Sequence, residues 1–168
     1  MLDLETYGTG ANSALLAVGA VKFDPTTNEV GDSFYCVVDK QSCLDLGLEI
    51  DAATEEWWSK QSPEAKTVLG EVGEPLREVL LKFGAFCGEH AAMWGNGSDF
   101  DNAILASAYR KTKIEQPWKY FNNRCYRTMK SMFPTIKMKR VGVHHNAVDD
   151  ARSQAIHLMA ILEHMRTS

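Results

Sequence analysis

The chain has 168 residues, of which 45% are hydrophobic and 24% charged, and its net charge at pH 7 is −4. This length suits one domain, residues 1–168, with a substantial core, and the composition is that of an ordinary globular protein. The longest apolar stretch, 14–23, is too short to cross a bilayer, and the first residues do not resemble a signal peptide, so we expect no membrane partner and a cytoplasmic location.

Four cysteines are spread widely along the chain, and no two have the C-x-x-C spacing of a zinc or redox motif. We expect free thiols that mostly pack in the core, with a disulfide as the less favoured alternative. The four residues are Cys36, Cys43, Cys87 and Cys125.

The first part of the chain predicts three strands. Residues 1–6 alternate apolar and polar side chains, 14–23 are largely apolar, and 34–38 form a further short run. A turn cluster at 24–28 separates the second run from the third, so that connection is short. We therefore expect an antiparallel meander of three strands.

The chain after residue 50 has a different pattern, in which helices alternate with short strands. Helical spacing of apolar residues or capping signals predict helices at 51–61, 74–86, 98–111 and 148–165, with a further helix start at Ser62-Pro63. Short strands are predicted at 91–94 and 124–126. The expected fold is α/β, with a mixed five-stranded sheet flanked by helices.

The charges are distributed unevenly. Residues 1–60 hold eleven acids and three bases, whereas residues 110–140 hold ten bases and one acid. Aromatic residues lie among these bases: Trp118, Tyr120, Phe121, Tyr126 and Phe133. Bases neutralise phosphates and exposed rings stack on nucleobases, so this segment suits a nucleic acid. The alternative is a solvated surface whose aromatic residues lie in the core.

Asp3 and Glu5 form the first acidic motif. Residues two apart on a strand project from the same face, so both carboxylates are expected to point together. Neighbouring carboxylates repel each other unless a cation lies between them. For this short motif alone, the alternative is an exposed strand end.

A second motif follows a predicted short strand, at the start of a helix, which is a common place for sites in α/β sheets. Gly95 and Gly97 permit tight turning and close approach to a ligand, and Asp101 falls in the first helical turn. The alternative is a capping box made by Ser98 and Asp101. Asp99 competes with Asp101 for a functional role.

The third motif surrounds the start of the last helix. His145 precedes that helix and Asp150 lies inside it, so a ligand held by Asp150 is within reach of the histidine. The small residues Ala147 and Ala151 favour close packing of this helix on the sheet. The alternative is that the acids only stabilise the positive end of the helix.

Together the three motifs supply the groups that a two-metal nuclease needs. Carboxylate oxygens are ligands that magnesium and manganese prefer. Two such ions about 3.5–4 Å apart stabilise the attacking and the leaving oxygen during displacement at phosphorus. A neutral histidine, whose ordinary pKa is about 6.5, can accept a proton from the attacking water.

The order and spacing of these motifs resemble the DEDDh 3′–5′ exonucleases, a superfamily with an RNase H-like fold that includes RNase T, oligoribonuclease and polymerase proofreading subunits. The motifs that carry the resemblance are Asp3-x-Glu5-Thr6, Asn96-Gly97-x-x-Phe100-Asp101-Asn102 and His145-x-x-x-x-Asp150-Ala151-Arg152. Further segments look like a phage and prophage branch that is exodeoxyribonuclease VIII-like: Glu56-Trp57-Trp58-x-x-Gln61-Ser62, Trp94-Gly95-Asn96-Gly97 and Pro117-Trp118-x-Tyr120.

The resemblance implies two divalent metal ions, Mg²⁺ or Mn²⁺, bound by Asp3, Glu5, Asp101 and Asp150. It implies that His145 is the general base. The substrate contacts that it implies are Leu4, Thr6, Asn96 and Phe100. His144 and Asp149 are one residue out of register and are not expected to be catalytic. Homodimers are common among such enzymes, so a homodimer is also an expectation.

Trp57 and Trp58 are adjacent on a predicted helix, where neighbouring side chains point about 100° apart. The two rings are therefore not expected to face the same core. We expect at least one of them to be buried, and Trp58 is the candidate for stacking on a nucleobase.

The expected activity is hydrolysis at the 3′ end of a single-stranded or 3′-overhanging nucleic acid, with DNA favoured over RNA, to release nucleoside monophosphates. One alternative is a non-catalytic nucleic-acid-binding module with the same fold, and another is an exoribonuclease or oligoribonuclease. Asp3 is only two residues from the first residue, so fraying of this strand would loosen the first metal ligand.

Overall fold

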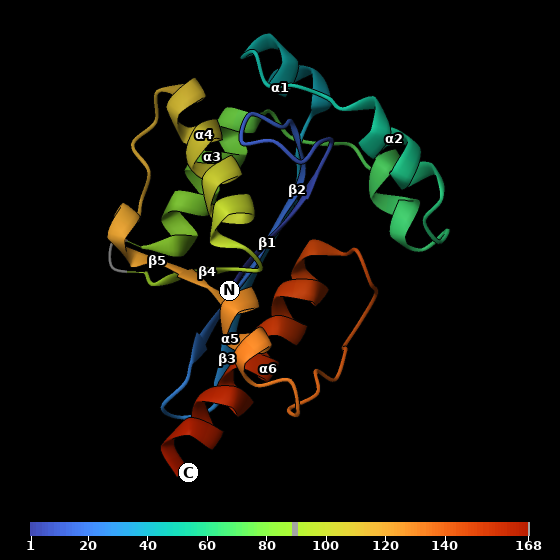
Figure 1. The fold of residues 1–168 in the computed structure, drawn as a ribbon. Coiled ribbons are helices and arrows are strands. Elements are labelled where there is room, and N and C mark those ends of the chain that lie inside the picture. Colours follow the sequence, from blue (N-terminus) through green and yellow to red (C-terminus); the bar gives the residue numbers. More distant parts are fainter. Residues whose placement is uncertain (89–90, 168) are drawn as a thin grey trace.

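A computed structural model describes residues 1–88 and 91–167 of the chain. Its framework is a five-stranded sheet with the strand order β3-β2-β1-β4-β5 (Figure 1). The strands are β1 (Leu2–Thr6), β2 (Leu15–Asp24), β3 (Glu29–Val37), β4 (Met93–Gly95) and β5 (Asn123–Cys125).

The sheet is mixed. β2 pairs antiparallel with both β1 and β3, whereas β4 runs parallel to β1 and β5 runs parallel to β4. This topology confirms the predicted α/β fold with its antiparallel meander, and it is consistent with an RNase H-like fold. Every residue of the central strand β1 is buried, although its alternating sequence predicts a half-buried strand, because helices cover both faces of the sheet.

The helices lie on both sides of the sheet (Figure 1). α3 (Leu76–Cys87) and α4 (Ala103–Thr112) pack on one face, and the long α6 (Ala147–Thr167), red in Figure 1, packs across β2, β1 and β3 on the other. The shorter helical segments are α1 (Lys40–Asp45), α2 (Ala52–Ser59), η1 (Ala65–Gly70), η2 (Ser98–Asn102), η3 (Tyr120–Asn122) and α5 (Tyr126–Met132).

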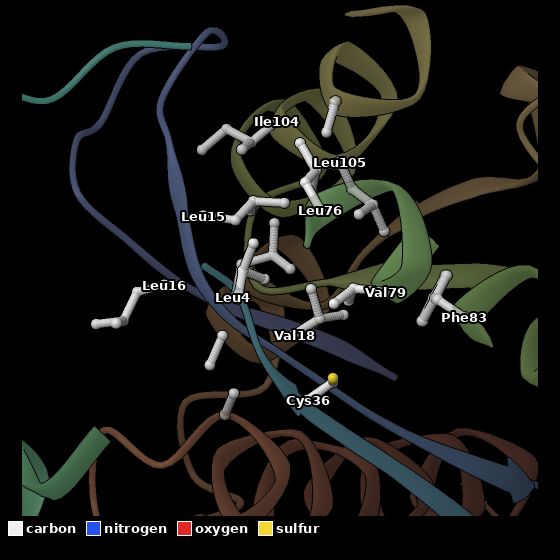
Figure 2. Close-up of a cluster of buried hydrophobic side chains, with 14 of the residues drawn as sticks. Leu4, Leu15, Leu16, Val18, Cys36, Leu76, Val79, Phe83, Ile104 and Leu105 are labelled. Atoms are coloured by element: carbon white, nitrogen blue, oxygen red, sulfur yellow. The ribbon is translucent and has the colours of Figure 1, made fainter. Parts of the chain in front are cut away.

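The larger hydrophobic core fills the space between the sheet and the α3–α4 layer. Figure 2 shows Leu4 and Val18 of the sheet beside Leu76, Val79 and Leu105 of the two helices. The buried residues of α3 recur at helical spacing, which is the pattern that predicts this helix. A second, smaller cluster lies beneath α6.

Some element boundaries differ from the predictions. α1 has six residues with Cys43 as its buried residue, so it is too short to show a helical period, and it was not predicted. The strand predicted at 124–126 ends at Cys125, and α5 starts at the next residue. β3 begins at Glu29, whereas the predicted strand begins at 34. The first residues of β3 are largely exposed and carry no apolar pattern, so the sequence does not reveal them as a strand.

The helix predicted to start at Ser98 begins in an unexpected way. Residues Ser98–Asn102 form a π-helical turn, η2, which leads into α4. Its N-cap is Gly97, with a φ of 125°, and no side chain makes a capping hydrogen bond. The capping box of Ser98 and Asp101 is therefore not formed. Such π-turns often occur at functional sites.

The structure bears on two expectations that follow from composition. All four cysteines are free thiols. Within residues 1–88 and 91–167, no helix combines the length and the apolar character needed to cross a membrane.

Candidate active site

Asp3 and Glu5 lie on the central strand of the sheet. Both are buried, with exposed fractions of 9% and 7%, so the alternative of an exposed strand end is wrong. One oxygen from each carboxylate and one from Asp150 lie within 4.8 Å of one another. This spacing lets the two acids of β1 and the chain-distant Asp150 serve as ligands of one metal ion.

The start of β1 is held firmly by its neighbours. Met1 is 6% exposed and packs with Val21 and Tyr126 beneath α6. The Val21 N–H donates to the Met1 carbonyl oxygen at 2.9 Å. These contacts hold the start of β1, and with it Asp3, in place.

Asp101 reaches the same place from η2. The missing side chain of Gly95, at the end of β4, makes room for this turn, because a Cβ there would lie 2.3 Å from Asn102 Oδ1. The Leu4 N–H donates to Asp101 Oδ1 at 3.1 Å and so ties η2 to β1. Asp101 Oδ2 is buried and has no hydrogen-bond partner among the described residues.

The first turns of α6 carry Asp150 to the sheet. Gly19 of β2 permits this approach, because a Cβ there would lie 2.2 Å from the carbonyl carbon of Ala147. Asp150 Oδ2 accepts a hydrogen bond from the His145 N–H at 3.1 Å. Asp150 Oδ1 forms an ion pair with Arg140.

The buried acids perturb one another's ionisation. Burial, and after it the neighbouring carboxylates, raise the pKa of Asp3 well above its usual range. The same two causes raise the pKa of Glu5 to about 8. Burial also raises the pKa of Asp101 to about 7, although backbone hydrogen bonds oppose this shift. A cation bound between these groups would relieve the repulsion.

The donor set fits divalent cations. Three of the carboxylates lie within 4.8 Å of one another, and the fourth, Asp101, lines the same pocket. Oxygen ligands are those that Mg²⁺ and Mn²⁺ prefer. The unpartnered Asp101 Oδ2 gives independent support, because a buried carboxylate oxygen without a partner costs free energy that a bound cation would recover. The residues available as ligands are Asp3, Glu5, Asp101 and Asp150.

His145 lies beside the acids in a left-handed backbone conformation, with a φ of 63°. Its ring centroid lies 4.9 Å from that of Trp57, edge to face, and 3.7 Å from that of His144, stacked. Burial, followed by the charge of His144, lowers the pKa of His145. The ring is therefore neutral near pH 7, and a neutral imidazole has one nitrogen that can accept a proton.

The two neighbours that are out of register differ in their surroundings. Asp149 Oδ2 accepts a hydrogen bond from the Val143 N–H at 2.8 Å, so this acid fixes the loop before α6. His144 is exposed, yet one of its ring nitrogens lies within 4.8 Å of a ligand atom of His145 and of Asp150. Asp149 is thus structural, whereas His144 lies at the edge of the site.

All five expected catalytic residues line one pocket of about 720 Å³. Three cationic side chains, Arg127, Lys130 and Arg140, line it as well. The buried acids suit metal ions, and the cationic side chains suit phosphate groups, so the pocket suits a ligand that brings both. The five expected residues are Asp3, Glu5, Asp101, His145 and Asp150.

The expected substrate contacts also line the pocket, but they differ in accessibility. Trp58 is 2% exposed, and its indole N–H donates to the Thr6 carbonyl oxygen at 2.9 Å. Trp58 therefore lacks the exposed face that stacking requires, and its expected stacking role is wrong. Trp57 is 42% exposed and is the tryptophan that can contact a base. The other expected contacts in the lining are Leu4, Thr6, Asn96 and Phe100.

Gln154 is a polar residue of the pocket that we did not predict. It is buried, and its Nε2 donates to Asp3 Oδ1 at 2.6 Å. It lies four residues after Asp150, and residues at this spacing share one face of a helix, so the sequence held a signal for it. Arg127, Lys130 and Arg140 belong to the predicted basic segment, but spacing alone does not show that they face the pocket.

Comparison with known proteins agrees with this geometry. A family model described as "3'-5' exoribonuclease Rv2179c-like domain" matches residues 1–162. The chain belongs to this 3′–5′ exonuclease family. This exonuclease is also similar to the exodeoxyribonuclease of Enterobacteria phage T4, with 27% identity over 157 residues that cover 76% of the chain and 68% of the phage protein. The predicted relation to DEDDh exonucleases is confirmed.

The exonuclease builds its candidate site from three separate parts of the chain. β1 supplies two acids, η2 supplies one, and the start of α6 supplies the last. His145 lies in the loop that directly precedes α6. These are the three motifs that carry the resemblance, and the parallel pairing of β1 with β4 brings the first two together.

Proposed function

We propose that the chain is a metal-dependent exonuclease that removes nucleoside monophosphates from the 3′ end of single-stranded or 3′-overhanging DNA. The observation that carries the proposal is the convergence of Asp3, Glu5 and Asp150, whose ligand oxygens lie within 4.8 Å of one another. Membership of a 3′–5′ exonuclease family supports the direction of attack.

Asp3, Glu5, Asp101 and Asp150 would hold two divalent cations, Mg²⁺ or Mn²⁺. When bound, such cations supply electrostatic stabilisation of the attacking and leaving oxygens in an in-line displacement. The chain's own contribution is to fix its carboxylates in place. Gln154 orients Asp3, and the Leu4 N–H orients Asp101.

His145 is assigned as the general base. Its neutral ring accepts a proton from the water molecule that attacks the terminal phosphorus. The new phosphorus–oxygen bond forms as the bond to the 3′ oxygen of the preceding nucleotide breaks. That oxygen takes up a proton and becomes the new 3′-hydroxyl, while the released nucleotide keeps the phosphate.

The remaining pocket residues position the end of the strand. Arg127 and Lys130 are assigned to the phosphates, and the exposed face of Trp57 is assigned to the terminal base. A volume of about 720 Å³ is typical of pockets that enclose a small ligand, which suits one or two nucleotides. A pocket of this size requires an unpaired end, so single strands and overhangs are the proposed substrates.

DNA is the proposed polymer because the phage relative is named an exodeoxyribonuclease. RNA is the second candidate, because the family description names an exoribonuclease. DNA and RNA oligonucleotides of the same sequence differ at the 2′-hydroxyl, so their relative kcat/KM values separate the two.

The proposal is tested with a 5′-labelled single-stranded oligonucleotide in the presence of Mg²⁺ or Mn²⁺. We expect a ladder that shortens from the 3′ end, release of mononucleotides and complete inhibition by EDTA. Asp150→Asn should abolish the ladder, whereas Asp32→Asn, a control at an exposed acid of β3, should retain it. Full turnover by folded Asp150→Asn would refute the assignment. Binding without cleavage by the unaltered protein would identify a non-catalytic module instead.

A further inference from the structure

The aromatic residues of the basic segment fall into two groups. Trp118 and Tyr126 are each 1% exposed and belong to the hydrophobic clusters. Tyr120 and Phe121, by contrast, are 79% and 64% exposed. Their ring centroids are 5.4 Å apart, edge to face, on the short turn η3. Two adjacent exposed rings of this size form an apolar surface patch, and such patches mark sites that bind another molecule.

Cationic side chains flank these rings. Lys119 and Arg124 are exposed on either side of η3. The Arg124 guanidinium donates to the carbonyl oxygens of Phe121 at 2.9 Å and Asn123 at 3.0 Å, so its charge is held against the turn. No acidic residue occurs between positions 116 and 148 of the chain. The charge therefore complements a polyanion, and the rings complement its unpaired bases.

The chain connects this surface directly to the active-site pocket. β5 follows η3 and lies beside β4 (Figure 1). Its residue Cys125 is in register with Gly95, and the next residue, Asn96, lines the pocket. α5 begins immediately after β5, and its residues Arg127 and Lys130 line the pocket. The three extended residues of β5 cover about 10 Å. The exposed rings of Tyr120 and Phe121 therefore lie a few nucleotides away from the acids of the pocket. Cations thus continue from the pocket along α5 to η3.

We propose that Lys119, Tyr120, Phe121 and Arg124, together called the η3 surface, bind the single strand upstream of the 3′ end that is held in the pocket. The inference rests on the proposed function and adds to it a second contact for the same strand. Stacking and phosphate contacts are independent of base identity, so the η3 surface increases affinity for longer strands without selecting a sequence.

The kinetic test compares two substrate lengths. The double variant Tyr120→Ala/Phe121→Ala should raise the KM for a strand of about 12 nucleotides by about five- to a hundredfold, and it should leave kcat unchanged. Hydrolysis of a dinucleotide, which is too short to reach η3, should proceed at the unaltered rate. The exchange variant Tyr120→Phe/Phe121→Tyr keeps both rings and should match the unaltered protein. Val72→Ala, at a 97% exposed apolar residue outside this surface, is the matched control.

A binding measurement removes turnover from the test. In EDTA, the fluorescence anisotropy of a labelled single strand reports affinity alone. The double variant should bind about five- to a hundredfold more weakly than the unaltered protein. Arg124→Gln should reduce the slope of log affinity against log salt concentration by about 0.7, the value for one phosphate contact on a single strand.

The possible outcomes separate the two proposals. If the double variant keeps the KM and the affinity for the long strand, the η3 surface is not a nucleic-acid site, even though the exonuclease activity stands. If the double variant changes only from dimer to monomer, as measured by light scattering, the surface binds a second copy and the inference is wrong. If the unaltered protein releases no nucleotides from either substrate, the proposed function fails instead.

Discussion

His145 is held from several sides, whereas the adjacent His144 is exposed. The backbone N–H of His145 is bonded to Asp150, its ring meets Trp57 edge to face, and its φ of 63° differs from that of ordinary loop residues. These contacts fix the imidazole next to the acids. They support His145, and not its neighbour, as the group that accepts the proton.

Replacing His145 tests this assignment. Asparagine tolerates a positive φ, so His145→Asn should preserve the fold. We expect kcat to fall by about 100- to 10,000-fold while affinity for the strand is retained, because a general base contributes about this much. His144→Asn should change kcat by less than about tenfold. Loss of strand binding in His145→Asn, with kcat preserved at saturation, would give the histidine a structural role.

Gln154 acts through another residue and is a positioning residue. Its amide holds Asp3 Oδ1 at 2.6 Å. Gln154→Leu should therefore raise the Mg²⁺ concentration for half-maximal activity by about 10- to 100-fold, as for other partners of metal ligands. Ile156→Ala, at a 40% exposed position of the same helix, is the control. A fall in kcat that saturating Mg²⁺ does not reverse, at unchanged metal affinity, would contradict this role.

Spacing in the sequence was sufficient to relate neighbouring residues within a motif, but not to describe their surroundings. It placed Asp3 with Glu5 and His145 near Asp150, because strand and helix periods fix such relations. It could not decide which of Trp57 and Trp58 is exposed, because the phase of α2 relative to the rest of the molecule depends on tertiary packing. For the same reason the orientation of Gln154 and Arg140 was not predicted.

At the scale of elements, two glycines let three segments approach one another. Gly19 accommodates the start of α6, and Gly95 accommodates η2. Both positions lie on strands, where glycine weakens the strand itself, so close approach of another segment explains their presence. The acids of the second and third motifs reach β1 because of these contacts.

Gly19→Ala should disturb this packing. The added Cβ would lie 2.2 Å from the carbonyl carbon of Ala147, which is backbone and cannot rotate away. We expect α6 to shift, the free energy of unfolding to fall by about 1–3 kcal/mol, and activity to decrease as Asp150 is displaced. Gly10→Ala is the matched control, because nothing lies within 4 Å of its Cβ position. Equal urea midpoints and activities for the two variants would contradict the packing account.

Helices with long periodic patterns were predictable, whereas α1 and α5 were not. α3 and α6 bury one face over several turns, so their apolar spacing is visible in the sequence. α1 and α5 have six and seven residues, too few to establish a period. The π-turn η2 depends on its contact with β1, which no local pattern encodes.

For the molecule as a whole, the close grouping of buried acids lowers the free energy of unfolding when no cation is bound. The pKa of Glu5 is raised from its ordinary 4.5 to about 8, and the pKa of Asp3 is also raised. Between pH 4.5 and 8, the folded protein therefore keeps protons that the unfolded chain has lost. Stability must fall as the pH rises through this window.

This dependence is measurable by urea unfolding in EDTA. The free energy of unfolding should decrease from pH 5 towards pH 8, and saturating Mg²⁺ should restore it at the upper end, since a bound cation stabilises the folded state. Glu5→Gln should show a weaker decrease than the unaltered protein, because a neutral amide does not titrate. A free energy that rises across this window in EDTA, equally in both proteins, would contradict the assigned repulsion.

The central claim is that separated acids share divalent cations in one pocket. Calorimetric titration with Mn²⁺, in the presence of a nucleoside monophosphate, measures this most directly. We expect two ions for each chain, and a loss of at least one of them in each of the variants Asp3→Asn, Glu5→Gln, Asp101→Asn and Asp150→Asn. Manganese binding that is absent, or that is unchanged in all four variants, would contradict the account.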